Sequence, residues 1–305
     1  MKEEIINGIK YSLDEETLTA EVVELKDDIQ LYDEKLTAEQ LMNTIFNGYE
    51  GDIIIPETVV FNELTYRVTS IGERAFQDCE NLTSITIPDS VASIGEQAFN
   101  NCFSLTKIAI PDSVTSIGDG AFENCIKLTS ITISDNVKSI GDMTFSWCFA
   151  LTEIVIPNSV TMIGCEAFEC CFALKSIVIP ARVTEIGECA FTGCSALTSI
   201  IVAEGNPRYD SRMNCNAIIE TATNTLIRGC PQTIIPESVT EIGEYAINDC
   251  EKQTSIIIPD NVTSIGVEAF CYCESLKSIT IPASVKSIGS QAFEWCKMLY
   301  SITFQ

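Results

Sequence analysis

A repeat of 23 residues constrains the fold of this chain more than any other feature of its sequence. Each unit follows the pattern P-x-x-V-x-x-I-G-x-x-A-F-x-x-C-x-x-L-x-x-I-x-I, as in PDSVASIGEQAFNNCFSLTKIAI, which begins at Pro88. The other units begin at Pro56 (in a 32-residue version), Pro111, Ser134, Pro157, Pro180, Pro236, Pro259 and Pro282. A unit this short cannot bury its apolar side chains alone, so we expect the units to stack as coils of one elongated solenoid.

Each part of the unit predicts a local structure. The L-x-x-I-x-I segment alternates like a half-buried strand, and the following proline ends it because proline cannot donate to a ladder. The V-x-x-I-G step predicts a second short extended segment, and A-F-x-x-C predicts a tight helical or 3₁₀ turn. The predicted fold class is a curved right-handed solenoid, mainly β, with short parallel strands about 4.8 Å apart. In the unit from Pro88, the side chains expected to point inward are Val91, Ile94, Ala98, Phe99, Cys102, Leu105, Ile108 and Ile110.

Two regions break the repeat. We expect residues 1–55 to form an N-terminal cap on the solenoid of residues 56–305, with strands in GIKYSL and TAEVVEL. Within this cap, a capping box at Thr37 and Gln40 predicts a short helix over Ala38–Phe46. The unit at 203–235 is longer, and its segment NAIIETATNTLIRG (216–229) predicts a hairpin that turns at 222–224.

The sequence ends on LYSITFQ, a strand-like segment without a polar cap. Either the chain continues beyond this sequence, or this end packs on a partner and offers a surface for oligomers.

The composition excludes several classes of function. Asp and Glu number 43 against 18 Lys and Arg, and the resulting net charge of −25 repels nucleic acids and anionic membranes. The chain has no histidine, which excludes a Ser-His-Asp triad and a histidine-liganded zinc ion. No apolar run approaches the roughly 18 residues that span a bilayer, and the N-terminus lacks the apolar core of a signal peptide. No nucleophile–base motif, phosphate loop or metal cluster is recognisable, so we expect a protein without enzymatic activity or cofactor.

The phrase LTSITIPDSVASIGEQAFNNC (82–102) resembles the BspA-like leucine-rich repeat proteins, also called the Treponema pallidum type. The likeness covers residues 52–305. It implies a leucine-rich repeat fold and a protein that is secreted or attached to the cell surface. It also implies adhesin-like binding of a protein or glycan, such as host matrix proteins, mucins or other bacterial surfaces. A structural spacer and an intracellular protein-interaction scaffold stay open as alternatives.

A cysteine recurs at one fixed position of the unit. It is found at Cys79, Cys102, Cys125, Cys148, Cys171, Cys194, Cys250, Cys273 and Cys296. Like positions on adjacent coils lie about 5 Å apart, which a disulfide could span, but stacked side chains point in parallel rather than at each other. The number of these thiols is odd, and their spacing provides no C-x-x-C zinc motif. We therefore interpret them as a structural ladder of small, buried apolar groups.

Cys215 and Cys230, which flank the predicted hairpin, form the best candidate disulfide if the protein is exported. Free thiols are the alternative.

Two rows of variable positions are the candidate binding residues. The residue between the last two apolar positions of L-x-x-I-x-I points out of the sheet, and in the middle coils it is branched and apolar: Val155, Val178, Ile201 and Ile257. After the ladder cysteine, the middle coils carry Phe103, Ile126, Phe149 and Phe172. Exposed apolar and aromatic side chains are typical anchors of binding surfaces. The alternatives are β-propensity alone, cover by the hairpin, or local packing of the rings under the turns.

Overall fold

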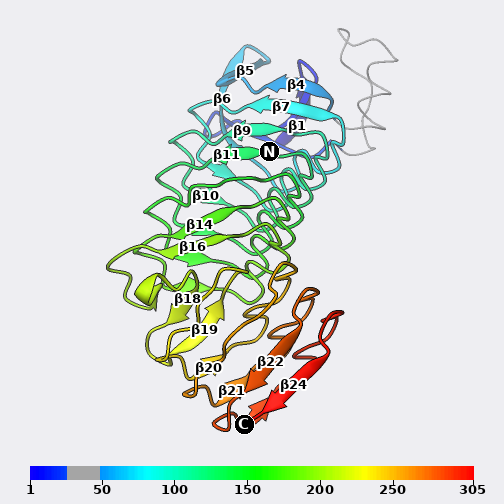
Figure 1. Ribbon diagram of the computed structural model, residues 1–305. Coiled ribbons are helices and arrows are strands. Elements are labelled where there is room, and N and C mark those ends of the chain that lie inside the picture. The colour runs from blue at the N-terminus through cyan, green and yellow to red at the C-terminus, as the bar shows by residue number, and fades with distance from the viewer. Residues whose placement is uncertain (26–48) are drawn as a thin grey trace.

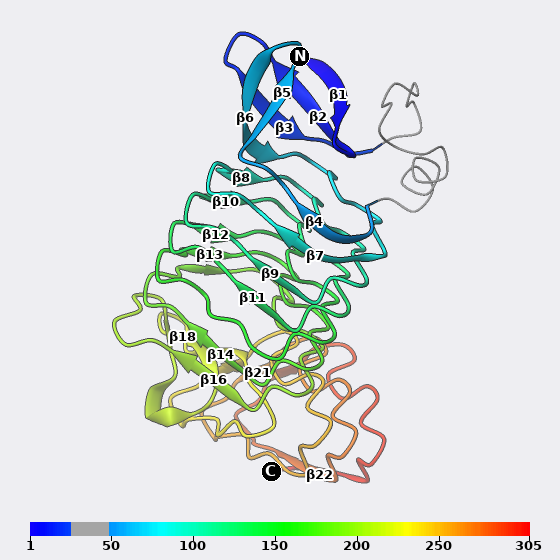
Figure 2. The same cartoon turned by 90° about the horizontal axis from the view of Figure 1, so that it is seen from above.

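The computed structural model describes residues 1–25 and 49–305, so the helix predicted over Ala38–Phe46 lies outside the described residues. The chain forms a β-solenoid of about ten coils, as the repeat predicts. The coils stack along one long axis, and the two termini lie toward opposite ends of it (Figures 1 and 2).

A small sheet covers the N-terminal end of the solenoid (Figure 2). Its first three strands form an antiparallel meander, and the third lies parallel to β6, which also pairs with β5. β6 then pairs with β8 of the first regular coil, so this sheet continues directly into the stack. Its strands are β1 Lys2–Ile6, β2 Ile9–Asp14, β3 Thr19–Val22, β5 Thr58–Phe61 and β6 Leu64–Ile71.

The regular coils build two faces of parallel strands. Face 1 consists of the L-x-x-I-x-I segments, whose strands are β4 Gly51–Ile54, β7 Leu82–Thr86, β9 Lys107–Ala109, β11 Ser130–Thr132, β14 Ser176–Ile179, β16 Ser199–Val202, β22 Ser278–Ile281 and β24 Ser301–Phe304. Face 2 consists of the V-x-x-I-G steps, whose strands are β8 Ser93–Ile94, β10 Ser116–Ile117, β12 Ser139–Ile140, β13 Met162–Ile163, β15 Glu185–Ile186, β20 Glu241–Ile242, β21 Ser264–Ile265 and β23 Ser287–Ile288. Equivalent residues pair from coil to coil, for example Ile177 with Ile200. This register keeps every inward position facing the core.

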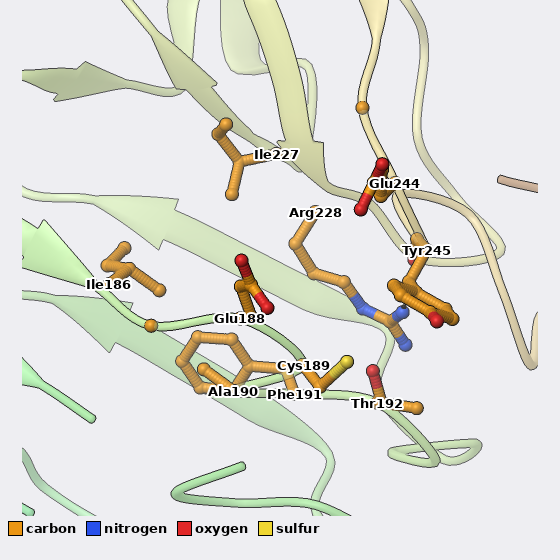
Figure 3. A pocket seen from close by; sticks show the side chains of 12 residues that line it. Ile186, Glu188, Cys189, Ala190, Phe191, Thr192, Ile227, Arg228, Glu244 and Tyr245 are labelled. Atoms are coloured by element: carbon orange, nitrogen blue, oxygen red, sulfur yellow. Dashed lines mark hydrogen bonds between the residues drawn. The ribbon is translucent and has the colours of Figure 1, made fainter. Parts of the chain in front are cut away.

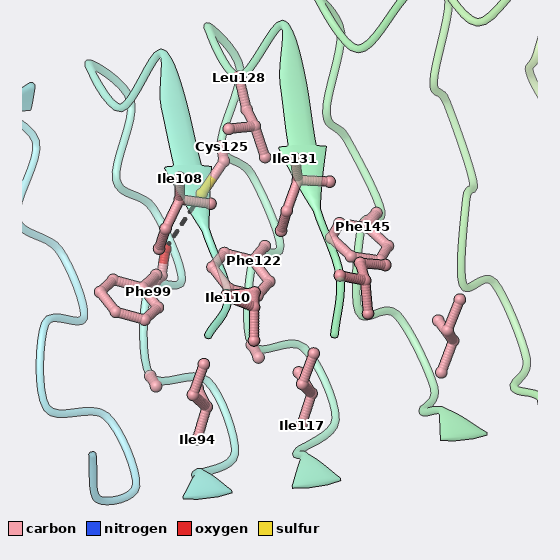
Figure 4. Close-up of a cluster of buried hydrophobic side chains, with 14 of the residues drawn as sticks. Ile94, Phe99, Ile108, Ile110, Ile117, Phe122, Cys125, Leu128, Ile131 and Phe145 are labelled. Atoms are coloured by element: carbon pink, nitrogen blue, oxygen red, sulfur yellow. Dashed lines mark hydrogen bonds between the residues drawn. The ribbon is translucent and has the colours of Figure 1, made fainter. Parts of the chain in front are cut away.

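The core repeats one set of side chains at every level. All eight positions predicted to point inward in the unit from Pro88 are at most 5% exposed. Six phenylalanine rings, from Phe76 to Phe191, stack face to face with centroids 5.2 to 5.6 Å apart. Figure 4 shows three of them, Phe99, Phe122 and Phe145. No single coil could bury these rings, so adjacent coils depend on each other for stability.

The A-F-x-x-C segment forms successive tight turns rather than the helical or 3₁₀ turn expected from the sequence. Asn100 N–H donates to the Gln97 carbonyl, and Cys102 N–H donates to the Phe99 carbonyl. Gln97 and Asn101 have left-handed backbones, with φ of 54° and 61°, and such residues interrupt a right-handed helix. The N–H groups of Gln97, Phe99 and Asn101 therefore point along the stack and donate to carbonyls of the next coil.

The extended unit (203–235) divides the molecule. It contains β17 Tyr209–Asp210, a 3₁₀ turn η1 Arg212–Asn214, β18 Ile218–Glu220 and β19 Thr225–Arg228. The hairpin expected at 216–229 corresponds to β18 and β19, which pair antiparallel, and β19 continues face 2 by pairing with β20. The buried apolar residues form two separate clusters that meet at this unit. We call the coils before it the first stack (49–202) and those after it the second stack (236–305).

Candidate binding surface

The ladder cysteines lie inside the solenoid, and all fifteen cysteines of the chain are free, including Cys215 and Cys230. Most ladder thiols donate a hydrogen bond to the carbonyl 26 residues earlier, on the preceding coil, as Cys125 does to Phe99 in Figure 4. The Sγ–O distances are 3.1 to 3.3 Å for Cys102, Cys125, Cys148, Cys171, Cys194, Cys273 and Cys296. The sequence indicates a small apolar group at this position, but it does not reveal this donor role.

Burial also makes the ladder thiols of the first stack unreactive. It raises the pKa of Cys148 to about 12 and that of Cys194 to about 12. A thiol with such a pKa stays protonated at neutral pH, and only the thiolate is a good nucleophile or metal ligand. Within residues 1–25 and 49–305, no group of three His, Cys, Asp or Glu side chains is placed to hold a metal ion.

The outward residues of face 1 form an exposed apolar stripe in the middle of the solenoid. Val155 is 80% exposed, Val178 and Ile201 are each 50% exposed, and Ile257 is 84% exposed. Ile234 belongs to the same row and is 74% exposed, although the irregular length of its unit hides it in the sequence alignment. The signal that could have found it is the Ile235-Pro236 step, because Ile234 precedes this step as Ile257 precedes Ile258-Pro259. We call these five residues the apolar stripe.

The hairpin does not cover the apolar stripe, because it joins face 2. The extended unit instead separates Ile201 from Ile234. The Asn216 carboxamide accepts from Ile200 N–H at 2.7 Å, and Ser211 Oγ accepts from Val202 N–H at 2.9 Å, so side chains cap the edge of β16. The stripe thus has two parts, one of three residues on the first stack and one of two residues around the start of the second.

A second apolar surface follows the turns beside the ladder cysteines. The Phe149 ring stacks on Phe172 with centroids 5.0 Å apart and also contacts Trp147 at 5.7 Å. Phe172 is 43% exposed and Trp147 is 42% exposed, whereas Phe103 is half-buried. The structure therefore gathers Phe149 and Phe172 into one cluster with Trp147.

The backbone of this cluster is strained. The residue before the ladder cysteine has a left-handed backbone in every regular coil. Asparagine and glycine adopt this conformation at little cost, as at Asn101, Asn124 and Gly193. Trp147, Tyr272 and Trp295 occupy the same position with φ of 63°, 56° and 57°. A bulky residue in this conformation costs about 1–3 kcal/mol, and such strain is typical of functional surfaces.

The described residues contain no helix long and apolar enough to cross a bilayer.

Comparisons with known proteins assign the repeat. The family model of the BspA type leucine rich repeat region matches residues 69–198 and 227–305 in six copies. No curated protein sequence matches the chain.

Several solved structures share the fold. A leucine rich cell surface protein from Faecalibacterium prausnitzii is 28% identical, with a TM-score of 0.61, over 100% of this chain and 95% of that one. A leucine-rich repeat protein from Eubacterium ventriosum is 24% identical, with a TM-score of 0.65, over 98% of this chain and 71% of that one. The pneumococcal vaccine antigen PcpA is 16% identical, with a TM-score of 0.57, over 99% of this chain and 87% of that one. The last two likenesses concern the fold alone.

Proposed function

This chain belongs to the BspA-type leucine-rich repeat family, and we propose that it is a non-enzymatic binding protein that contacts a protein or glycan partner through face 1. The observation that carries the proposal is the apolar stripe. Five branched apolar side chains project from the middle of face 1, while Thr86, Thr132 and Thr280 occupy the same row on coils outside it. Ile54 of β4 is a further exposed member of this row, but it pairs with Thr86 and is separated from the stripe by three coils. Monomeric proteins rarely leave a row of such residues in water unless it contacts something.

The surroundings of the stripe fit a binding surface with an apolar centre and a polar rim. The neighbouring outward row carries Glu153, Ser176 and Ser199 on the same coils. Binding surfaces combine an apolar centre with polar, solvent-accessible edges, and aromatic residues often act as anchors. The cluster of Trp147, Phe149 and Phe172 provides such anchors at the edge of the first stack.

We further propose that the protein acts at the cell surface as an adhesin-like module. The similar protein from Faecalibacterium prausnitzii is described as a cell surface protein, and it matches this chain over its full length. Host matrix proteins, mucins and the surfaces of other bacteria are the partners to test first. The net charge of −25 disfavours nucleic acids and anionic lipids as partners.

A second candidate is an intracellular protein-interaction scaffold, which the fifteen free cysteines favour. Disulfides form in oxidising compartments, and Cys165 is exposed and free to react there. Counting free thiols in protein taken from its native compartment would distinguish the two locations.

The experiment for the main proposal is a binding screen followed by substitutions in the apolar stripe. Val155→Lys and Ile257→Lys change the two most exposed stripe residues and should leave stability within about 0.5 kcal/mol. We expect each to weaken binding of the captured partner by about tenfold or more, because a charge replaces an apolar contact. Surface plasmon resonance with the purified partner measures this loss.

Thr86→Lys and Thr280→Lys are matched controls, because they place the same charge in the same row outside the stripe. Equal binding by stripe and control variants would overturn the assignment of face 1. A screen that captures no specific partner would favour a structural spacer.

A further inference from the structure

A pocket of about 200 Å³ lies where the two stacks meet, away from the residues assigned to face 1. One wall is formed by residues 186–192 of the last coil in the first stack, and the other by residues 243–245 of the second stack. Ile227 and Arg228 of the extended unit complete the lining, as Figure 3 shows.

The pocket exists because the extended unit has a shortened turn. In the preceding coil, the N–H groups of Glu166, Phe168 and Cys170 donate to the next coil at 2.7 to 2.9 Å. In the extended unit Gly229 takes the place of the turn phenylalanine, since its N–H donates to the Ala246 carbonyl as Phe168 donates to Ala190. Only two residues separate Leu226 from Gly229, whereas four separate Ile186 from Phe191 in the preceding coil, so this level offers fewer carbonyl groups to the N–H groups of the coil before it.

Backbone donors therefore face the pocket without partners. Among the residues described, the N–H groups of Cys189 and Phe191 make no hydrogen bond, although both positions donate to the next coil in regular units. The third member of the row, Gly193 N–H, donates to the Asp249 carboxylate at 2.9 Å. A carboxylate thus already replaces the missing carbonyl at one end of this row.

Arg228 adds a buried charge to the same pocket. The residue is only 6% exposed, and none of the carboxylates in the described parts of the chain lies within ion-pair distance of it. Nη1 donates to the Tyr245 carbonyl at 2.9 Å and to the Asn248 carboxamide, while buried Nε–H has no partner. By contrast, the more exposed Arg208 and Arg212 each have a carboxylate partner. A buried cation without a counter-ion is costly, and an anion in the pocket would remove that cost.

We propose that this pocket binds a small carboxylate ligand, held by the Arg228 guanidinium and the N–H groups of Cys189 and Phe191. Arginine recognises a carboxylate through paired, charge-assisted hydrogen bonds, and the unpaired backbone donors extend the same site. Glu188 and Glu244 also line the pocket and are exposed, so they repel a doubly charged anion such as phosphate more strongly than a singly charged carboxylate. The pocket therefore selects a monocarboxylate whose other end is neutral or cationic, which describes a free amino acid or the C-terminus of a peptide.

The test titrates the full chain, labelled with ¹⁵N-arginine, with four probes. L-alanine represents a free amino acid, N-acetyl-L-alanine represents a peptide C-terminus, and N-acetyl-L-alaninamide lacks the carboxylate. Inorganic phosphate, titrated at a pH above its second pKa, represents a dianion. We expect one or both carboxylates to shift the Arg228 Nε–H resonance and to bind in calorimetry at least tenfold more tightly than the amide and phosphate. The tighter of the two carboxylates identifies the source of the ligand.

Substitutions separate this site from general effects of charge. Arg228→Gln should weaken carboxylate binding at least tenfold, and Arg208→Gln, at an exposed arginine, should leave it unchanged. Arg228 also donates hydrogen bonds to Tyr245 and Asn248 of the second stack, so the Arg228→Gln variant can lose structure. In that case the shift of the Nε–H resonance in the unmodified chain decides whether the pocket binds a carboxylate. If neither carboxylate shifts that resonance at 50 mM (roughly the weakest binding that matters for a small ligand), or if the amide binds equally well, the proposal is wrong. This inference does not depend on the function proposed for face 1.

Discussion

The first and second stacks are built from the same repeat but are held together differently. The first contains six stacked phenylalanine rings without a break, and Tyr49 adds a seventh ring at its N-terminal end, 4.9 Å from Phe76. In the second, Ile247 occupies the ring position of the first coil, so the row of rings at this position is reduced to the pair of Phe270 and Phe293. The two apolar clusters are separate, and the unit between them contributes Arg228 where a regular turn would contribute apolar side chains.

The difference shows what repetition provides and what it prevents. Where each coil repeats its neighbour, the rings, thiols and turn N–H groups all have partners on an adjacent coil, and each pair of coils adds to the stability. Where one unit departs from the repeat, the partners are lost and polar groups such as Asp249 and Arg228 fill the gap. Hydrogen-bonding groups without a partner, which are able to bind a ligand, therefore lie beside the least regular unit.

The two tryptophans allow the stacks to be followed separately, because Trp147 lies in the first and Trp295 in the second. In the Trp295→Phe variant, the fluorescence of Trp147 follows the unfolding of the first stack. In the Trp147→Phe variant, the fluorescence of Trp295 follows the second.

Alkaline pH should separate the stacks most strongly. Burial raises the pKa of Cys79, Cys148 and Cys194 in the first stack to about 12 from an ordinary value of 9.0. Below pH 9 the thiols are protonated in both states, whereas between pH 9 and 12 the unfolded chain releases protons that the folded chain retains. The free energy of unfolding therefore falls as pH rises, by about 1.4 kcal/mol per thiol at pH 10 and about 4 kcal/mol for the three.

The second stack should lose less over the same range. Burial raises the pKa of Cys271 to about 12, so this one thiol of the second stack contributes a loss like that of each first-stack thiol. A hydrogen bond with Cys250 raises the pKa of Cys273, but the bond with Cys273 lowers the pKa of Cys296, so these two contributions oppose each other. Urea unfolding of the single-tryptophan variants at pH 7.5, 9 and 10, under reducing conditions, measures both stacks. Parallel losses at Trp147 and Trp295 would contradict this distinction.

Removing a ring should cost more inside the first stack than at its junction with the extended unit. Phe145 is fully buried and stacks on Phe122 at 5.6 Å and Phe168 at 5.5 Å. Phe145→Ala should destabilise the chain by about 3–5 kcal/mol. Phe191 stacks only on Phe168, and its other side faces the junction pocket, so Phe191→Ala should cost about 1 kcal/mol less. Urea unfolding followed at Trp147 compares the two, and equal losses would mean that the junction is packed as tightly as the interior.

The regular parts of this molecule can be predicted from the sequence because every repeat unit shows the same pattern of residues. Eight inward positions, the strand segments of most coils and the outward side chains of Val155 and Ile257 follow from the period and the alternation. The strands predicted at 151–156 and 253–258 do not form, although the outward residues there keep their positions. Ile234 escapes the same reasoning because its unit does not have the regular length. The assignment of the stripe as a binding surface stays a prediction.

The pocket around Arg228 could not be predicted from the sequence. Its walls at 187–192 and 243–245 come from coils that are neighbours only because the extended unit omits part of its turn. An arginine near a glycine and a cysteine indicates nothing by itself, and the unpaired N–H groups of Cys189 and Phe191 are visible only against the hydrogen bonds of a regular coil. The donor role of the ladder thiols is hidden for the same reason, since the acceptor carbonyl lies on the preceding coil.

Adding a methyl group between coils should have the smallest effect, and it tests how rigidly each pair of coils is joined. A Cβ at residue 187 would lie 2.3 Å from Cys165 N and 2.5 Å from Gly164 C, so the coils would have to move apart. At residue 243 the nearest atom is the Leu226 carbonyl oxygen at 2.9 Å, and the others lie at 3.4 Å or more. Overpacking costs about 1–3 kcal/mol, so we expect Gly187→Ala near the upper end of this range and Gly243→Ala near the lower end.

The two glycine substitutions form a matched pair. Neither residue has a positive φ, so alanine adds no backbone strain at either position. The entropy that alanine removes from the unfolded chain, about 0.4–1 kcal/mol, is the same for both and cancels in the comparison. Urea unfolding of both variants, followed at Trp147 and Trp295, measures the difference. The two positions differ in the distance from the added Cβ to the neighbouring coil. Equal losses in the free energy of unfolding would therefore mean that two coils of the first stack separate as easily as the extended unit and the second stack.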